Sequence, residues 1–123
     1  MKGAELAKKA NWTKSDGSTW WTPKDGFDGD INKVILESGT RIDRFGYDDG
    51  YFVAPEGTLY TSRSLLIGTD TKTYTVFEVL KPVEVNAGKT VPWFGEAGGG
   101  IQYQFNEQIF KLLDDGILRK VGN

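Results

Sequence analysis

The stretch VPWFGEAGGGIQY (residues 91–103) is the most informative part of this 123-residue chain. Two aromatic rings and a glycine lead to a carboxylate and then to three consecutive glycines. Each glycine loses more backbone freedom on folding than any other residue, so such a run is costly to order. It is typical of a loop where φ must be positive or where the backbone approaches another group closely. A plain tight turn between two strands fits the same spacing.

The residues that follow the glycines alternate in character. Ile101, Tyr103 and Phe105 are apolar, and Gln102 and Gln104 stand between them. A period of two predicts a strand with one apolar face and one amide-bearing face. We therefore expect Gln102 near the start of a strand, presented by the glycine loop.

Composition favours a β-rich or α+β fold over a helical bundle, because aromatic residues make up 13% of the chain and 16 residues are glycine. The length suits one domain with one core. We predict an α+β fold, a compact single domain over residues 1–123 with mostly antiparallel β-strands and a few short helices.

Local patterns place the elements of this fold. Residues 4–10 and 106–113 favour short helices, with Asn106 as N-cap and Gly116 as the stop of the second. Residues 46–50 and 86–88 favour turns, and residues 11–30 an ordered aromatic loop. The predicted strands are 40–45, 51–54, 73–80, 83–85, 101–105 and 117–121, and residues 32–37 form a strand or a helical turn.

Several classes of function are excluded by what the chain lacks. It has no cysteine and no histidine, so thiolate sites and Ser-His or Cys-His catalysis are absent, and we expect no metal site. The net charge of -2 is spread along the chain and suggests neither nucleic acid nor membrane as a partner. No apolar run reaches the ~20 residues that span a bilayer. The abrupt start, without a signal-peptide core, favours an excised domain over a cytosolic protein.

Two arginines stand in settings that suit a diphosphate. Arg44 precedes Gly46 at a strand end, and Arg63 precedes an apolar run. The guanidinium offers a rigid fork of donors that matches phosphate oxygens. Ordinary ion pairs are the competing interpretation, in which Arg63 pairs with Glu56. The corresponding partners for Arg44 are Asp43, Asp48 and Asp49.

Three tryptophans precede residue 30 and carry a non-enzymatic alternative. Trp12, Trp20 and Trp21 stand among Gly, Ser, Asp and Pro residues. Large rings usually pack in a core, but they also stack on sugars or bases. If they are exposed, they would line a groove of a carbohydrate- or peptide-binding module.

Six blocks that follow one another carry a family resemblance. They are GTRIDRFG (39–46), GYFVAPEG (50–57), SRSL (62–65), YTVFEVLKP (74–82), PWFGEAGGGIQY (92–103) and LLDDGIL (112–118). In this order they resemble the TNT domain, named for the tuberculosis necrotizing toxin, over residues 33–121. Residues 1–32, a helix and an aromatic loop, lie outside the resemblance.

The resemblance implies an NAD+ glycohydrolase with NAD+ as substrate and no cofactor. It also implies a secreted bacterial toxin, of which this is the C-terminal domain, acting in the target-cell cytoplasm in interbacterial competition. A cognate immunity protein and a monomeric free domain are expected. An ADP-ribosyltransferase using the same pocket is the enzymatic alternative. Use of NADP+ stays open; a cation for its 2′-phosphate could come from Lys24, Lys33, Lys72 or Lys89.

The resemblance also assigns residues to the site. Arg44 and Gln102 match the catalytic arginine and glutamine. Phe45 and Phe52 match aromatic positions beside the nicotinamide. Arg63 matches an arginine that binds the phosphates.

The proposed chemistry makes few demands on side chains. Nicotinamide in NAD+ is a cationic leaving group and needs no general acid. Gln102 would orient a ribose hydroxyl or the attacking water, because a neutral amide is a poor base. The nearby carboxylates, Glu96 and Asp43, could accept the proton. A histidine of the family is replaced in this chain, and we place its substitute around Tyr74.

Overall fold

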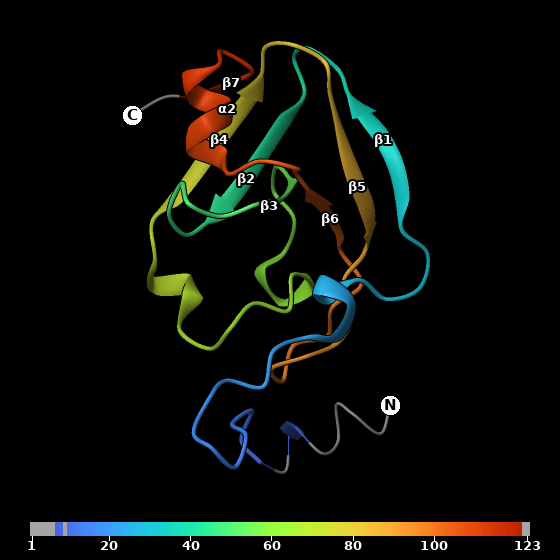
Figure 1. Ribbon diagram of the computed structural model, residues 1–123, viewed down its shortest axis with the longest axis vertical. Helices are drawn as coiled ribbons and strands as arrows, with labels where there is room; N and C mark the ends of the chain where they lie inside the picture. The colour runs from blue at the N-terminus through green and yellow to red at the C-terminus, as the bar shows by residue number, and fades with distance from the viewer. Residues whose placement is uncertain (1–6, 9, 122–123) are drawn as a thin grey trace.

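The computed structural model describes residues 7, 8 and 10–121, and a seven-stranded sheet forms its body (Figure 1). Every pair of neighbouring strands is antiparallel, in the order β1-β5-β6-β3-β2-β4-β7. The strands are β1 (Asn32–Leu36), β2 (Arg41–Phe45), β3 (Phe52–Pro55), β4 (Tyr74–Val79), β5 (Val83–Lys89), β6 (Ile101–Gln104) and β7 (Leu118–Lys120). The other elements are α2 (Ile109–Asp114) and the 3-10 turns η1 (Pro23–Gly26), η2 (Tyr60–Ser62) and η3 (Thr69–Thr71). The α+β fold with mostly antiparallel strands is confirmed.

The predicted turn at residues 86–88 is wrong, because these residues lie inside β5. They pair with β6, and Gly88 is opposite Gln102. A Cβ at Gly88 would lie 2.8 Å from the carbonyl oxygen of Asp30 and 2.9 Å from the ring of Phe27. The glycine is therefore required by close packing against the strand and not by a turn. Residues 32–36 form a strand, which settles the choice left open for that segment.

The predicted N-cap at Asn106 is also wrong, since α2 begins at Ile109. The backbone N–H groups of Ile109 and Phe110 donate to the carbonyls of Gly50 and Asp48. The β2–β3 loop thus satisfies donors that a capping side chain would otherwise take.

Two further predictions concern helix ends. Gly116 follows α2 with a φ of 72°, which confirms it as the stop. The helix predicted over residues 4–10 falls mostly outside the described residues.

No helix within the described part of the chain is long and apolar enough to cross a membrane.

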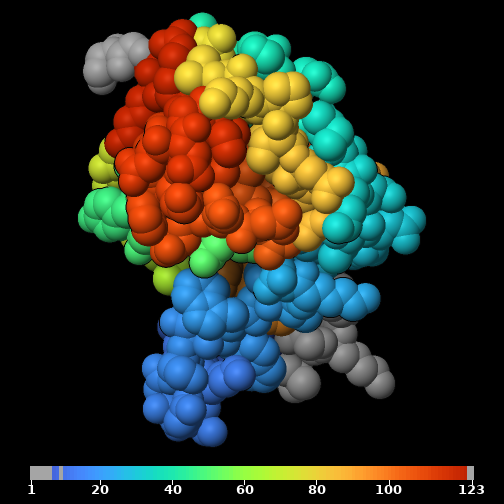
Figure 2. Space-filling model, turned by 45° about the horizontal axis from the view of Figure 1, so that its top comes forward, coloured from blue at the N-terminus to red at the C-terminus, as the bar shows by residue number. Residues whose placement is uncertain are grey.

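Two separate apolar clusters hold the fold together. The larger lies between the sheet and α2, and its buried members are Leu36, Ile42, Val53, Phe77, Val79, Val85, Phe105, Ile109, Leu112 and Leu118. The smaller joins the N-terminal segment to the loop after β5, and it comprises Ala7, Trp12, Val91, Trp93 and Phe94 with Trp20 and Leu66 beside them. The N-terminal segment, blue in Figure 2, forms a lobe against the body of strands.

The three consecutive glycines allow two loops to touch. Gly98 and Gly99 have φ values of 67° and 85°. A Cβ at Gly100 would lie 2.8 Å from the carbonyl oxygen of Ser62, and the Gly100 N–H donates to that oxygen at 3.0 Å. The N–H groups of Gly98 and Gly99 donate to the carbonyls of Thr61 and Thr90. Positive φ and close approach are therefore both present, and these amides serve the fold, not a phosphate.

Gly98→Ala should destabilise the domain more than the matched control Gly99→Ala. Both residues have positive φ, so each substitution costs about 1–2 kcal/mol in backbone strain. Only at Gly98 would the Cβ meet backbone atoms, 2.8 Å from Pro92 N and Thr90 O. We expect an extra loss of about 1–3 kcal/mol in the free energy of unfolding, measured in urea. Equal losses in the two variants would contradict the role assigned to close packing.

Candidate active site

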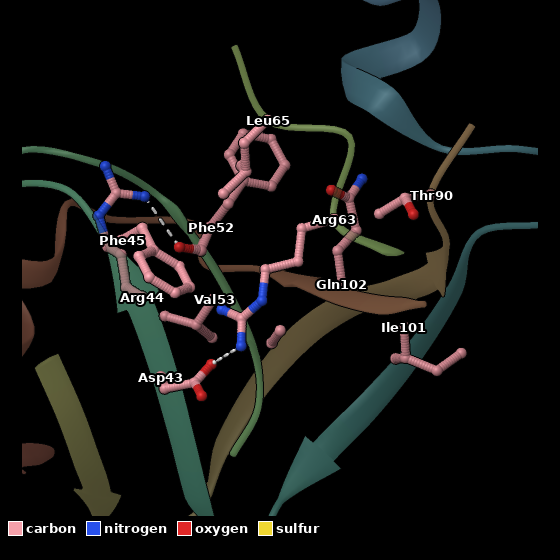
Figure 3. A pocket seen from close by; sticks show the side chains of 11 residues that line it. Asp43, Arg44, Phe45, Phe52, Val53, Arg63, Leu65, Thr90, Ile101 and Gln102 are labelled. Atoms are coloured by element: carbon pink, nitrogen blue, oxygen red, sulfur yellow. Dashed lines mark hydrogen bonds and ion pairs between the residues drawn. The ribbon is translucent and has the colours of Figure 1, made fainter. Parts of the chain in front are cut away.

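Two adjoining hollows lie at the end of the sheet where the loops after β3 and β5 meet. The smaller has a volume of about 40 Å³ and the larger about 320 Å³. The larger is within the range of about 300–1,000 Å³ that is usual for ligand pockets. All five residues assigned from the family resemblance line the smaller hollow, namely Arg44, Phe45, Phe52, Arg63 and Gln102 (Figure 3). All of these except Phe45 line the larger one as well.

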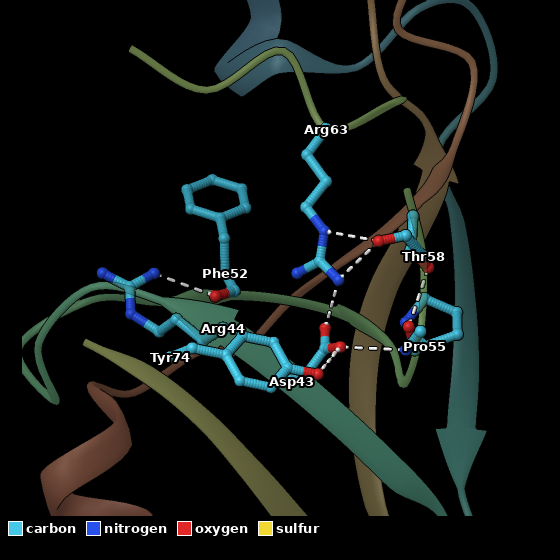
Figure 4. A network of polar contacts seen from close by, with 8 residues as sticks. Asp43, Arg44, Phe52, Pro55, Thr58, Arg63 and Tyr74 are labelled. Atoms are coloured by element: carbon cyan, nitrogen blue, oxygen red, sulfur yellow. Dashed lines mark hydrogen bonds and ion pairs between the residues drawn. The ribbon is translucent and has the colours of Figure 1, made fainter. Parts of the chain in front are cut away.

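A buried ion pair between Asp43 and Arg63 forms the floor of the site (Figure 4). Asp43 Oδ1 lies 2.6 Å from Arg63 Nη2, and the side chains are 0% and 7% exposed. This ion pair is the contact of Oδ1, which has no other polar partner among the described residues. Asp43 Oδ2 accepts hydrogen bonds from Gly57 N at 2.9 Å and Tyr74 OH at 2.7 Å. Arg63 therefore forms an ion pair, as the competing interpretation held, but its partner is Asp43 and not Glu56.

The guanidinium of Arg63 is held on one side and open on the other. Its Nε and Nη2 donate to the carbonyl of Thr58 at 3.1 and 2.8 Å. Nη1 has no polar partner in the described part of the chain, and Figure 4 shows it directed toward Phe52. The guanidinium carbon lies 5.0 Å from the centre of the Phe45 ring. One edge of this cation is thus left for a ligand.

Arg44 faces the β2–β3 loop. Its Nε donates to the carbonyl of Tyr47 at 2.8 Å and its Nη1 to the carbonyl of Phe52 at 2.9 Å. A Cβ at Gly50 would lie 2.0 Å from Nη2, so another residue there would displace the Arg44 guanidinium from this position. Burial lowers the pKa of Arg44, and the charges of nearby aspartates partly oppose this. Arg44 makes no ion pair with a described residue, so the competing interpretation, in which it pairs with an aspartate, is wrong.

Gln102 is held by the N-terminal segment. Its Nε2 donates to the carbonyl of Asp25 at 3.1 Å, and its amide lies against Gly26. Oε1 accepts no hydrogen bond from the described residues. The side chain on β6 is therefore fixed by its amide nitrogen, with its oxygen available at the junction of the two hollows.

Neither carboxylate proposed as proton acceptor is suitably placed. Asp43 is fully buried, and both of its oxygens are engaged. Glu96 lines neither hollow. Asp25, which sequence reasoning did not select, lines the larger hollow, and its Oδ2 accepts a hydrogen bond from Gln104 Nε2 at 3.4 Å.

The N-terminal segment supplies further residues of the site. Trp21, which the sequence offered as a stacking residue of a binding module, lines the larger hollow and is 60% exposed; Thr22, Asp25 and Gly26, which sequence reasoning did not select, line it as well. Trp12, in contrast, is 8% exposed and packs against Trp93 and Phe94 in the smaller apolar cluster. An exposed groove of three tryptophans therefore does not form. The signal in the sequence was the adjacent pair Trp20 and Trp21, but the sequence did not indicate which of the two rings packs in the core and which lines a site.

Asp43→Asn should lower the free energy of unfolding by about 3–5 kcal/mol, because it leaves the buried Arg63 charge without its partner. Glu78→Gln is the matched control, since it removes one partner of the more exposed pair with Arg119 and should cost about 1 kcal/mol or less. Urea unfolding at neutral pH measures both. A cost for Asp43→Asn as small as the control would contradict a structural role for the buried pair.

Tyr74, near which we expected the substitute for the family histidine, should titrate near pH 12. Burial and the bond to Asp43 raise its pKa from 10.0 to about 12. Both favour the protonated phenol in the folded state, so their stabilisation is present below pH 10 and is lost between pH 10 and about 12. Tyrosinate absorbance should show this late step in the wild type and lose it in Tyr74→Phe. If Tyr74→Phe instead removed an ionisation near pH 10, the raised pKa of Tyr74 would be contradicted.

Comparisons with known proteins agree on one family. The tuberculosis necrotizing toxin (TNT) family matches residues 35–121. The conidial surface nicotinamide adenine dinucleotide glycohydrolase nadA of Aspergillus fumigatus is 33% identical over 129 residues. The alignment covers 94% of this chain and 55% of nadA, so the chain spans about half the length of that relative.

Solved structures share the fold. Tuberculosis necrotizing toxin, complexed with its immunity factor IFT, superposes with a TM-score of 0.71 at 18% identity, over 89% of this chain and 66% of the toxin chain. Rhs1-CT, in complex with cognate immunity protein RhsI1, gives 0.61 at 17% identity, over 98% of this chain and 92% of the other. Together with the match over residues 35–121, these comparisons show that the chain belongs to the tuberculosis necrotizing toxin family.

Proposed function

We propose that this domain is an NAD+ glycohydrolase. Water attacks the anomeric carbon of the nicotinamide riboside, the glycosidic bond breaks, and the products are nicotinamide, ADP-ribose and a proton. Family membership and the activity named for the Aspergillus relative support this reaction. The single observation that supports it most directly is one connected site, lined by the rings of Phe45 and Phe52. The Arg63 guanidinium and the Gln102 amide line it too, and among the described residues Arg63 Nη1 and Gln102 Oε1 have no hydrogen-bond partner.

The smaller hollow, at its opening into the larger one, suits the nicotinamide end of the substrate. Phe45 and Phe52 line it, and aromatic faces stack on a flat cationic ring. The ring of Phe45 is fixed by Tyr60 at 5.2 Å and by Tyr74 at 4.9 Å between centroids. A rigid aromatic wall supports catalysis by holding the reacting bond in one orientation.

The arginines take different parts in this proposal. Arg63 offers Nη1 to the diphosphate, while Asp43 and Thr58 fix the rest of its guanidinium. Arg44 contributes positive charge and donates to the Phe52 carbonyl, so it helps to fix the residue that carries the Phe52 ring. The two cations act through electrostatics and positioning, and neither transfers a proton.

Gln102 orients a reacting group. Its Nε2 is held by Asp25, so Oε1 can accept a hydrogen bond from a ribose hydroxyl or from the attacking water. Such an interaction strengthens as positive charge develops on the ribose in the transition state. With Asp43 engaged and Glu96 outside both hollows, the proton released by water passes to solvent.

The biological setting follows from the relatives. The structures of tuberculosis necrotizing toxin and of Rhs1-CT contain immunity proteins. We infer that this domain is likewise a toxin, exported within a larger protein, that depletes NAD in a target cell and is neutralised by a cognate immunity protein. We expect the free domain to be a monomer that needs no cofactor.

Gln102→Ala should lower kcat for NAD+ cleavage by about 100-fold or more, because one oriented group at the reacting centre is lost. Asn86→Ala on the paired strand β5 is the control; it removes an amide that lines neither hollow and donates to Gln104, not to Asp25 or Gln102, so kcat should stay within about twofold. Chromatography of nicotinamide and ADP-ribose measures the rates, and circular dichroism verifies folding.

Three results would contradict the proposal. One is full activity of a folded Gln102→Ala variant. Another is the absence of turnover by the wild-type domain. The third is nicotinamide release with ADP-ribose attached to a macromolecule in place of free ADP-ribose, which would identify a transferase.

A further inference from the structure

The larger hollow has a wall that the family match does not include. Trp21, Thr22, Asp25 and Gly26 form it, and the match begins at residue 35. In Figure 3 the blue ribbon of this segment passes over the Gln102 side of the pocket. This wall therefore belongs to the site while lying outside the motifs that define the family.

The backbone of this wall is held in a strained conformation. Lys24, Asp25 and Gly26 are consecutive residues with φ values of 50°, 55° and 88°. Non-glycine residues avoid this region, so the surroundings must enforce it. The carbonyl of Asp25 accepts from Gln102 at 3.1 Å, and that of Gly26 accepts from Val91 N at 2.8 Å. Both anchors come from the β5–β6 region, which fixes the wall relative to the reacting centre.

Trp21 offers an uncovered aromatic surface in this wall. Its ring meets Phe94 edge-to-face, with centroids 6.0 Å apart and an interplanar angle of 89°. One such contact orients the indole but leaves it 60% exposed. Leu65 and Leu66 line the same hollow. A partly uncovered indole among apolar side chains is a platform on which a flat base can stack.

The charges of the larger hollow are divided. Arg44 and Arg63 line it where it adjoins the smaller hollow. Asp25 lines it on the N-terminal wall, where its Oδ2 accepts a hydrogen bond from Gln104 Nε2 at 3.4 Å and its Oδ1 accepts none from the described residues. Within the described residues, none of the four lysines considered for a 2′-phosphate lines this hollow. A carboxylate can accept hydrogen bonds from the hydroxyls of a ribose, and it repels a phosphate at the same position.

We propose that residues 21–26 form the adenosine end of the site, with adenine stacked on Trp21 and the adenosine ribose beside Asp25. The inference rests on the proposed function, because it places NAD+ with its nicotinamide in the smaller hollow and its diphosphate at Arg63. It adds a selectivity: the Asp25 carboxylate favours NAD+ over NADP+.

Binding and kinetics test the two parts separately. In Trp21→Ala, the affinity for ADP-ribose by calorimetry and the KM for NAD+ should both weaken by about 5- to 100-fold, with kcat nearly unchanged. Trp21→Phe should restore most of the affinity, because it retains an aromatic face. A folded Trp21→Ala variant that binds ADP-ribose as tightly as the wild type would overturn the stacking platform.

Charge substitutions test the selectivity. The wild type should use NAD+ at least about tenfold more efficiently than NADP+, and Asp25→Asn should reduce this ratio by about tenfold. Asp28→Asn removes the same charge from a neighbouring residue that lines neither hollow, so its ratio should match the wild type. Equal use of both dinucleotides by the wild type, or equal ratios in the two variants, would overturn the role of Asp25.

The ADP-ribose measurement separates this inference from the proposed function. If the wild type hydrolyses neither dinucleotide, the glycohydrolase proposal fails. Tryptophan-dependent binding of ADP-ribose would then still support the adenosine end, and its absence would overturn it.

Discussion

The site depends on one buried ion pair. Asp43 stands on β2 in the interior of the sheet, and Arg63 reaches it from a loop. Removing two charges from water is costly, and hydrogen bonds must satisfy their remaining groups. Thr58, Gly57 and Tyr74 do this for three of the polar positions around the pair. Because one carboxylate oxygen and one carbonyl fix Nε and Nη2, the unsatisfied Nη1 must face the hollow. The requirement to neutralise Asp43 thus determines where the site can bind an anion.

The glycine run connects the loop that bears Arg63 to the strand that bears Gln102, on the other side of the hollow. Gly100 touches Ser62, the residue before Arg63, and so ties the arginine loop to the start of β6. Gln102 follows two residues later on that strand. A side chain at Gly100 would separate the loops and move the amide relative to the guanidinium. The glycines therefore set the geometry between Arg63 and Gln102, although their own N–H groups face other parts of the backbone.

Sequence patterns predicted what is periodic and missed what depends on distant contacts. Alternation identified the strands that carry Asp43 and Gln102, because a half-buried sheet imposes a period of two. The strand that carries Phe52 was identified as a short apolar run closed by the turn at residues 55–57. Gly88 was assigned to a turn, since a glycine needed for packing has no local mark that distinguishes it. The partner of Arg63 was also missed. Asp43 precedes Arg63 by 20 residues in the sequence, and the two are in contact only because the chain after β3 returns to β2. Trp21 lies in an irregular segment, where no period separates a core ring from a site ring.

The chemistry explains why the irregular segment matters. A cationic leaving group departs without an acid, so the protein contributes mainly orientation and charge. Such a site gains rate from binding energy far from the bond that breaks. In our proposal, Phe45, Arg63 and Gln102 serve the cleavage, while the N-terminal segment recognises the adenosine end of the dinucleotide. Asp25 connects the two, because its carbonyl accepts a hydrogen bond from the Gln102 amide and the residue lines the larger hollow. A change that displaces the backbone of Asp25 would therefore reach the reacting centre, whereas a change confined to the Trp21 ring would not.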